Sequence, residues 1–194
     1  MAAVAASLLL TSCTASPAPR SSTTSGSHVD VDTPRLRSLK AEAGVAACRP
    51  GTGTGQLPPV TLPCLGGGRA VDLSSLRGPL VVNLFAQWCG PCRQELPYYQ
   101  ELHRKGRGVV QVVGVDYLDT RPDQALELVK ETGVTYPLLA DPDGDLRAEL
   151  KVRGLPGIVF VKADGSVVTE YRVVRSYAEL RGLVQHRLGV RLPA

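Results

Sequence analysis

The sequence lacks the residue clusters that build metal sites and nucleic-acid surfaces. Its three histidines, His28, His103 and His186, each stand alone. A zinc site built on a C-x-x-C motif needs two further ligands at a suitable spacing, and these histidines do not supply them. The net charge of +4 comes from mixed acidic and basic residues without a long basic run. We therefore predict no metal, no cofactor and no nucleic-acid partner.

The N-terminus also lacks a hydrophobic run long enough to cross a bilayer. The apolar segment from Ala2 to Leu10 is too short to span a membrane, and it lacks the positively charged start of a signal peptide. Leu10–Thr11–Ser12–Cys13 nevertheless resembles the lipobox of bacterial lipoproteins, whose cysteine is acylated and becomes the mature N-terminus. We predict a lipid anchor at Cys13. The alternative is a plain tail with a chance cysteine.

Low-complexity sequence follows the lipobox. Residues 14–35 are rich in Ser, Thr, Pro and Gly, which predicts a flexible tether. The whole chain is 43% hydrophobic, which suffices for one packed core. The predicted organisation is a signal segment at 1–13, a tether at 14–35, an N-terminal extension at 36–56 and one domain at 57–194.

Cys48 and Cys64 flank a stretch rich in Gly, Pro and Thr. In an oxidising compartment two such cysteines would pair, and closing this loop would stabilise the fold by roughly 3 kcal/mol. A second redox site is the alternative. The pair lacks a strand–helix setting, so we favour a structural disulfide.

The remaining two cysteines lie in Trp88–Cys89–Gly90–Pro91–Cys92, between an apolar run at Leu80–Phe85 and a helical pattern that extends to about Lys105. Cys89 then falls at a helix N-terminus, where unpaired N–H groups and the helix dipole favour a thiolate. We predict that Cys89 attacks and Cys92 resolves in a dithiol–disulfide cycle. A static bridge is the alternative, but it would close almost no loop and so would stabilise little.

Hydrophobic patterns predict the elements around this motif. Two nearly all-apolar runs, Leu80–Phe85 and Val109–Val115, predict buried strands. Thr120 and Asp123 resemble a capping box for a helix that ends near Gly133. Asp164–Gly165 predicts a hairpin between strands at 157–162 and 167–173, and Ser176 with Glu179 caps a last helix. The predicted order is β, α, β, α, β, β, α.

The stretch from Val81 to Pro97, VVNLFAQWCGPCRQELP, resembles the TlpA/ResA-like thiol–disulfide oxidoreductases of the thioredoxin superfamily. The resemblance covers about Leu57 to Leu188. It implies a thioredoxin-like α/β fold, with a central mixed sheet flanked by helices and an N-terminal extension. Another three-layer α/β architecture is the alternative.

The resemblance also implies further site residues. Arg153–Gly154–Leu155–Pro156 looks like the cis-proline loop that packs against the cysteine pair, so Trp88, Leu155 and Pro156 would contact an extended substrate peptide. Thioredoxin has an ionisable acid where this chain has Asn83. Glu95, three residues after Cys92 on one helix face, would replace it, raising the pKa of the Cys92 thiol and relaying its proton. A first-turn acid that merely suits the helix dipole is the alternative.

These features predict a monomeric, lipid-anchored enzyme outside the cytoplasm that reduces disulfides in exported proteins, apocytochrome c among the candidates. It would need a membrane thiol donor of the CcdA/DsbD type, since exported space is oxidising. The rival functions are a thiol oxidase or isomerase and a redox-inert binding module. A peroxiredoxin is disfavoured because no separate peroxidatic cysteine motif is visible.

Overall fold

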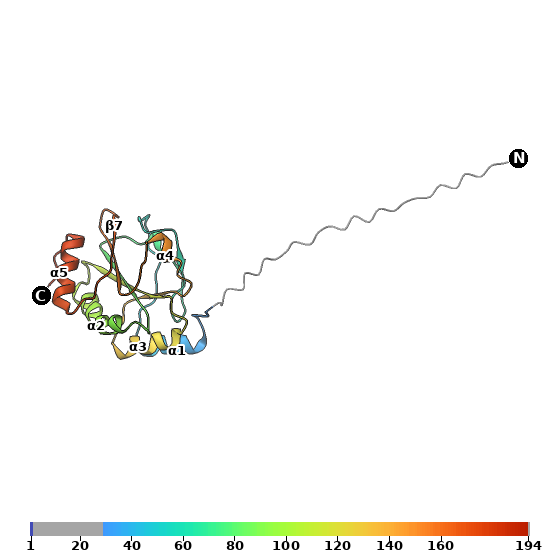
Figure 1. The fold of residues 1–194 in the computed structure, drawn as a ribbon, viewed down its shortest axis with the longest axis horizontal. Coiled ribbons are helices and arrows are strands. Elements are labelled where there is room, and N and C mark those ends of the chain that lie inside the picture. Colours follow the sequence, from blue (N-terminus) through green and yellow to red (C-terminus); the bar gives the residue numbers. More distant parts are fainter. Residues whose placement is uncertain (2–28, 194) are drawn as a thin grey trace.

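The computed structural model describes Met1 and residues 29–193. Residues 29–193 fold around a five-stranded mixed sheet (Figure 1). The strand order is β5-β4-β3-β6-β7, with β3, β4 and β5 parallel and β6 and β7 antiparallel. A separate antiparallel ribbon is formed by β1 and β2. The bounds are β1 Thr61–Leu62, β2 Val71–Asp72, β3 Leu80–Phe85, β4 Gln111–Tyr117, β5 Leu138–Asp141, β6 Gly157–Val161 and β7 Val167–Glu170.

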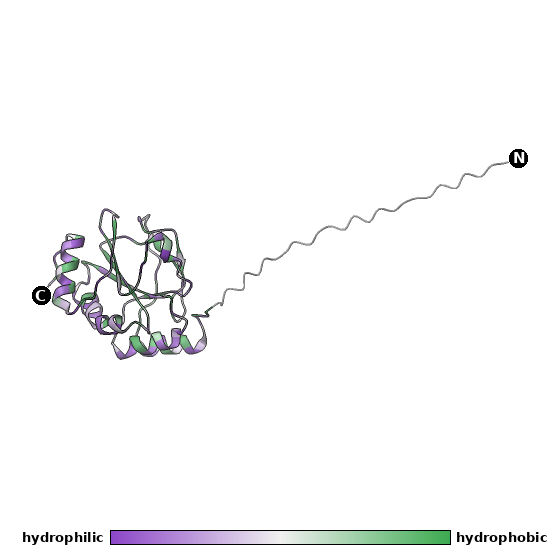
Figure 2. Ribbon diagram, viewed as in Figure 1, coloured by the Kyte–Doolittle hydropathy of each residue, from purple (hydrophilic) through white to green (hydrophobic). Residues whose placement is uncertain are grey.

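Five α-helices surround the sheet: α1 Pro34–Ala43, α2 Gly90–Lys105, α3 Pro122–Glu131, α4 Leu146–Glu149 and α5 Tyr177–Leu188. In Figure 1, α1 lies beside α3, and α2 lies near α5; both pairs are in contact. Hydrophilic and hydrophobic residues alternate along the helices (Figure 2), and the buried residues of α3 are all apolar, as expected of an amphipathic helix on a core. This is the thioredoxin-like fold that the sequence predicted.

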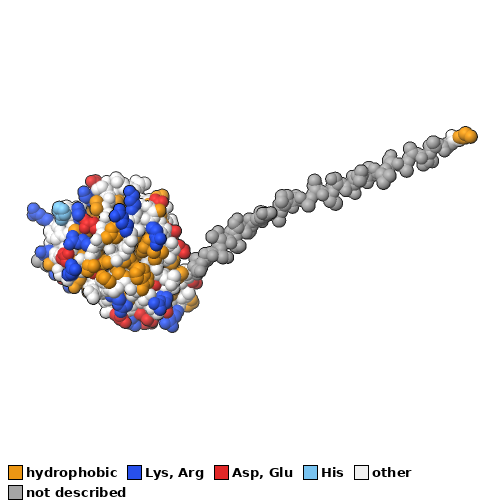
Figure 3. All heavy atoms as spheres, in the orientation of Figure 1, with side chains coloured by type: hydrophobic (Ala, Val, Ile, Leu, Met, Phe, Trp, Pro, Cys, Tyr) orange, Lys and Arg blue, Asp and Glu red, His pale blue; other side chains and the backbone are white. Residues whose placement is uncertain are grey.

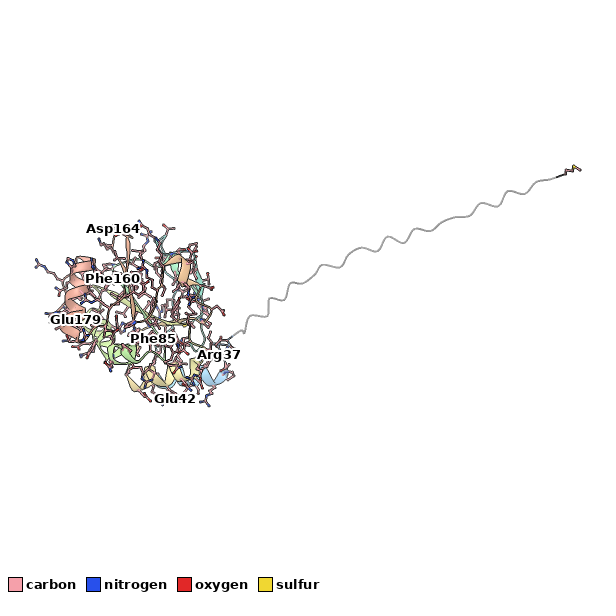
Figure 4. The ribbon with its side chains drawn as sticks, viewed as in Figure 1. Arg37, Glu42, Phe85, Phe160, Asp164 and Glu179 are labelled. Atoms are coloured by element: carbon pink, nitrogen blue, oxygen red, sulfur yellow. A yellow bond between two sulfur atoms is a disulfide. The ribbon has the colours of Figure 1, made fainter. Side chains whose placement is uncertain are left out.

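The central strand β3 is buried along its whole length because both faces of the sheet are covered. Val81 and Phe85 belong to a core that includes buried residues of α1, α2, α3 and α5, and Phe160 of β6 joins them (Figure 4). Alternate β3 residues, such as Val82 and Leu84, belong to a second core with the β1–β2 ribbon and α4. Two filled cores therefore fix the position and direction of β3, whose end leads into the cysteine motif.

The N-terminal extension begins earlier than predicted. Helix α1 starts at Pro34, with the Thr33 hydroxyl accepting a hydrogen bond from the Leu36 N–H, and Val31 is buried. The tether predicted at 14–35 is therefore too long at its C-terminal end, because residues 29–35 hold an apolar side chain and a helix cap that pack on the domain. Cys13 and the rest of the predicted tether lie outside the described residues.

Two further details differ from the prediction. Helix α3 has Arg121 at its N-cap and no side-chain cap, so the predicted Thr120–Asp123 capping box is wrong; Asp119 accepts from the Arg121 N–H instead. Strand β5 and the short helix α4 were not predicted, because the run at 138–141 is short. The capping of α5 by Ser176 and the hairpin between β6 and β7 are confirmed.

The surface of the described part is mixed in character. Apolar side chains gather near the centre of the face shown in Figure 3, among Lys and Arg side chains. No helix in residues 29–193 is both long and apolar enough to cross a membrane.

Candidate active site

The cysteine motif lies where β3 gives way to α2. Cys89 is the N-cap residue of α2, with an extended backbone, and Pro91 occupies the first turn, where its missing N–H removes no helical bond. Cys89 and Cys92 form a disulfide with their Cα atoms 5.3 Å apart. Strand, turn and helix thus place the two sulfur atoms within bonding distance.

The N-terminus of α2 gives Cys89 a setting that stabilises negative charge. Its Sγ accepts a hydrogen bond from the Cys92 N–H, 3.3 Å away. The first turn of α2 carries no acidic residue to oppose the helix dipole. Once the disulfide is reduced, this position favours the Cys89 thiolate, which is the reactive form of cysteine.

Trp88 forms an exposed surface beside the pair. Its side chain is 54% exposed although its Nε1–H donates to the Leu118 carbonyl, 3.2 Å away. Leu118 itself has a positive φ of 51°, in the loop that follows β4. The bond holds the indole in one orientation and leaves its face open to a partner.

The loop before β6 also contacts this region. The Leu155–Pro156 peptide bond is cis, and Leu155 packs against the core that includes Cys89 and Cys92. Arg153, Gly154, Leu155 and Pro156 line an open groove of about 420 Å³ together with residues 171–173, which follow β7. The sequence-predicted substrate loop therefore borders both the cysteine core and a groove.

Glu95 is a buried residue of α2, the helix that begins at the cysteine motif. It is 1% exposed, its Oε1 accepts from the Val174 N–H at 2.6 Å, and its Oε2 has no hydrogen-bond partner among the described residues. Burial raises the pKa of Glu95 to about 7, although the bond from Val174 lowers it. The carboxyl can therefore gain or lose a proton near neutral pH.

Asn83 has a structural partner in the core of β3. Its Nδ2 donates to the Tyr136 hydroxyl, 3.2 Å away, and both residues are buried. This bond satisfies an amide that cannot accept a proton from Cys92. Glu95 is thus the buried carboxyl on the helix that carries the cysteines.

A pair of buried acids behind the motif was not predicted. Asp116 lies next to Phe85 in the β3–β4 register, and Asp119 follows in the next loop. Asp119 accepts from the Gln87 N–H at 2.7 Å and from the Arg121 N–H at 3.0 Å. It therefore anchors the backbone just before Trp88. The signal was two acids at the carboxyl end of a predicted parallel strand.

These two carboxyls do not both ionise easily. Burial raises the pKa of Asp116 well above its ordinary value, and the charge and hydrogen bond of Asp119 raise it further. The raised pKa of Asp116 favours its neutral form, and the oxygens of Asp119 accept the two N–H groups.

The other cysteine pair lies away from the motif. Cys48 and Cys64 form a disulfide with Cα atoms 5.9 Å apart, and Cys64 bridges to Leu139 of β5. The bond ties the N-terminal extension to the edge of the main sheet. No cluster of three or more potential metal ligands occurs in the described part of the chain.

Comparisons with known proteins agree with this geometry. The chain is 37% identical over 101 residues to the thiol:disulfide interchange protein CycY of Rhizobium leguminosarum bv. viciae, covering 51% of this chain and 53% of the relative. It is 33% identical over 101 residues to the thiol-disulfide oxidoreductase ResA of Oceanobacillus iheyensis, covering 50% of this chain and 51% of the relative. The chain thus spans about half the length of these curated relatives.

A solved structure shows the same fold. A secreted disulfide oxidoreductase of Mycobacterium tuberculosis, described as homologous to E. coli DsbE, superposes with a TM-score of 0.59 at 25% identity, covering 66% of this chain and 96% of that one. Residues 54–170, more than half of the chain, match the AhpC/TSA family. The chain therefore has a thioredoxin-like fold and belongs to the AhpC/TSA family.

Proposed function

We propose that this protein is an extracytoplasmic, membrane-anchored thiol–disulfide oxidoreductase that reduces disulfides in exported proteins. The observation that carries the proposal is the position of Cys89 at the N-cap of α2. Cys89 forms a disulfide with Cys92, and its sulfur accepts a hydrogen bond from the Cys92 N–H. The relatives support it, since their names describe thiol:disulfide interchange proteins and oxidoreductases.

The reaction starts from the reduced pair. The Cys89 thiolate attacks one sulfur of a substrate disulfide, forms a mixed disulfide and releases the other substrate sulfur as a thiolate. Cys92 then loses its proton and attacks Cys89. The second substrate sulfur leaves and is protonated, so the substrate gains two electrons and the enzyme keeps the Cys89–Cys92 disulfide.

Glu95 supplies a base for the second step. Its pKa of about 7 lets it accept the Cys92 proton and later return it. Trp88, Leu155 and the cis Pro156 would hold the substrate chain across the pair. These roles combine the geometry with the resemblance to ResA-like proteins.

Each turnover leaves the enzyme oxidised, so a donor must return two electrons. A membrane thiol donor of the CcdA/DsbD type fits an enzyme held at the membrane. The substrates would be exported proteins with disulfides, such as apocytochrome c. The enzyme would act as a monomer.

The insulin reduction assay tests the reductase activity. Dithiothreitol as the donor should drive the wild-type chain to precipitate insulin faster than dithiothreitol alone, and Cys89→Ser should lose this acceleration. Cys13→Ser is the matched control, since it removes a cysteine outside the described domain and should keep full activity. Equal rates for the Cys89→Ser and wild-type chains would contradict the proposal.

Localisation rests on the lipobox at Cys13, and it has its own test. When the chain is expressed in a bacterium, the wild type should fractionate with membranes, and the Cys13→Ser variant should move to the soluble fraction. More than one acyl chain is needed for stable anchoring. Unchanged fractionation of the variant in detergent-free lysates would refute the anchor.

A further inference from the structure

The Cys48–Cys64 disulfide has unequal surroundings at its two sulfur atoms. Lys40 of α1 is buried, and its ammonium lies 2.8 Å from Cys64 Sγ and 2.7 Å from the Gly67 carbonyl. A disulfide sulfur is a weak acceptor, so it compensates poorly for burial of the charge. A thiolate at Cys64 would be a far stronger partner for this ammonium.

The glycines at 66 and 67 allow the loop after Cys64 to pack closely against Lys40. Gly66 and Gly67 have positive φ values of 71° and 84°. A Cβ on Gly66 would lie 2.8 Å from Lys40 Cβ and 2.9 Å from the Leu36 carbonyl oxygen. The glycine run after Cys64 thus lets the loop wrap closely around α1, with the Gly67 carbonyl on the ammonium.

Cys48 faces a different environment. Its Sγ lies 3.1 Å from the Leu138 carbonyl oxygen, a position in which a reduced thiol can donate its proton. Cys48 also lines a cavity of about 450 Å³, whereas Cys64 does not. The reduced pair therefore has a place for a neutral thiol at Cys48 and for a thiolate at Cys64.

The cavity indicates which thiol could reach Cys48. Arg49 and Arg107, both exposed, border it, and no acidic residue is among its described lining residues. Val110 and Leu139 contribute to its apolar wall. Cys48 is buried and lines this cavity, whose size and basic rim suit a small anionic thiol.

From these observations we propose that Cys48–Cys64 is a second thiol–disulfide exchange site, which low-molecular-weight anionic thiols reduce. The incoming thiolate bonds to Cys48 Sγ, the Cys48–Cys64 bond breaks, and its electron pair leaves on Cys64 as a thiolate beside Lys40. A second thiolate attacks the small-thiol sulfur of the mixed disulfide. It releases an oxidised thiol dimer and the Cys48 thiolate, which takes a proton from water.

The test uses a full-length chain in which Cys13, Cys89 and Cys92 are serine, so that only this pair remains. The oxidised protein is treated, without denaturant, with 2-mercaptoethanesulfonate or 2-mercaptoethanol, quenched with acid, alkylated and peptide-mapped. We expect an early mixed disulfide on Cys48 with an alkylated Cys64. We also expect a faster reaction with the sulfonate, compared per thiolate present, and an Arg107→Gln substitution should reduce that preference.

Variants of Lys40 test the leaving group. Lys40→Met should slow formation of the mixed disulfide on the order of tenfold, because a thiolate without its cation leaves more slowly. Lys40→Arg keeps the charge and should retain most of the rate. Lys130→Met is the matched control. Lys130 of α3 pairs with Glu42 of α1, the helix that also carries Lys40 (Figure 4 labels Glu42), but it does not contact the disulfide. Circular dichroism identifies any variant that does not fold.

Three results would overturn the proposal. One is reduction only after denaturant is added, as a purely structural disulfide would show. Another is an adduct on Cys64 instead of Cys48, which is measured in the parent and needs no Lys40 variant. The third is an equal rate for folded Lys40→Met and Lys130→Met. Each outcome leaves the Cys89–Cys92 activity untouched, so failure here is distinguishable from failure of the proposed function.

Discussion

At the scale of single residues, Glu95 should make stability depend on pH. Its pKa in the folded chain is about 7, above its ordinary value of 4.5, so the folded state binds more protons than the unfolded state between these values. Stability should therefore be highest below pH 4.5 for this group and fall as the pH rises through 7. The expected loss between pH 5 and pH 8 is on the order of 2 kcal/mol.

Glu95→Gln removes that titration. Denaturant unfolding at a series of pH values should show a flatter profile for the variant, and thiol alkylation of the reduced enzyme should show a changed Cys92 titration. Glu101→Gln, on the same helix, is the control and should keep the wild-type profiles. An unaltered thiol titration in Glu95→Gln would leave Glu95 as a buried structural acid without a role in proton transfer.

Asp119 should act as a positioning residue. Asp119→Ala leaves the Gln87 and Arg121 N–H groups without their acceptor, which should lower the free energy of unfolding by about 1–3 kcal/mol. It should also lower the pKa of Asp116, because a neighbouring charge is removed. Asp123→Ala in α3 is the control. Urea unfolding of both variants decides, and equal losses would contradict the positioning role.

At the scale of elements, the N-terminus of α2 should set the chemistry of Cys89. Only Gly90 and Pro91 separate the cysteines, so the thiolate is stabilised by backbone N–H groups without a side-chain donor. Pro91→His would add a cationic donor, as in DsbA-like oxidants. The variant should have a lower Cys89 pKa and a midpoint potential higher by tens of millivolts. Equal alkylation profiles for variant and wild type would contradict the expected effect of an added donor between the cysteines.

Elements with strong local signals were predictable. The buried strand β3 and helix α2 follow from an all-apolar run and a helical pattern, and the hairpin between β6 and β7 follows from Asp164–Gly165. Strand β5 is only four residues long, and its identity as a strand comes from pairing with β4. The predicted capping box of α3 was wrong because Asp119, and not Thr120, accepts the hydrogen bond from the Arg121 N–H. Asp119 is also fixed by a hydrogen bond from the Gln87 N–H.

The site divides in the same way. Cys89, Cys92 and Glu95 lie three residues apart at the start of one helix. Their positions relative to one another could therefore be predicted from the sequence. Asp119 with Gln87, and Lys40 with Cys64, meet only through the tertiary fold: 32 residues separate the first pair and 24 the second. Contacts of this kind have no local pattern in the sequence, and no spacing rule could have found them.

At the scale of the whole molecule, the domain has two disulfides in different surroundings. One lies at the N-terminus of α2, next to the exposed Trp88, in the core against which Leu155 packs. The other ties the N-terminal extension to β5, beside a buried lysine. A reductase role requires that the first be a reducing couple under the conditions of exported space.

The midpoint potential of the Cys89–Cys92 couple tests this claim most directly. Trp88 is the single tryptophan of the chain and lies next to Cys89, so its fluorescence should report this pair and not Cys48–Cys64. The full-length chain is equilibrated in dithiothreitol or glutathione buffers of graded potential, and alkylation mapping checks which cysteines are reduced. We expect a midpoint near that of thioredoxin, about −270 mV. A midpoint above roughly −180 mV, the region of protein disulfide isomerase, would contradict the reductase role and favour an oxidase or isomerase.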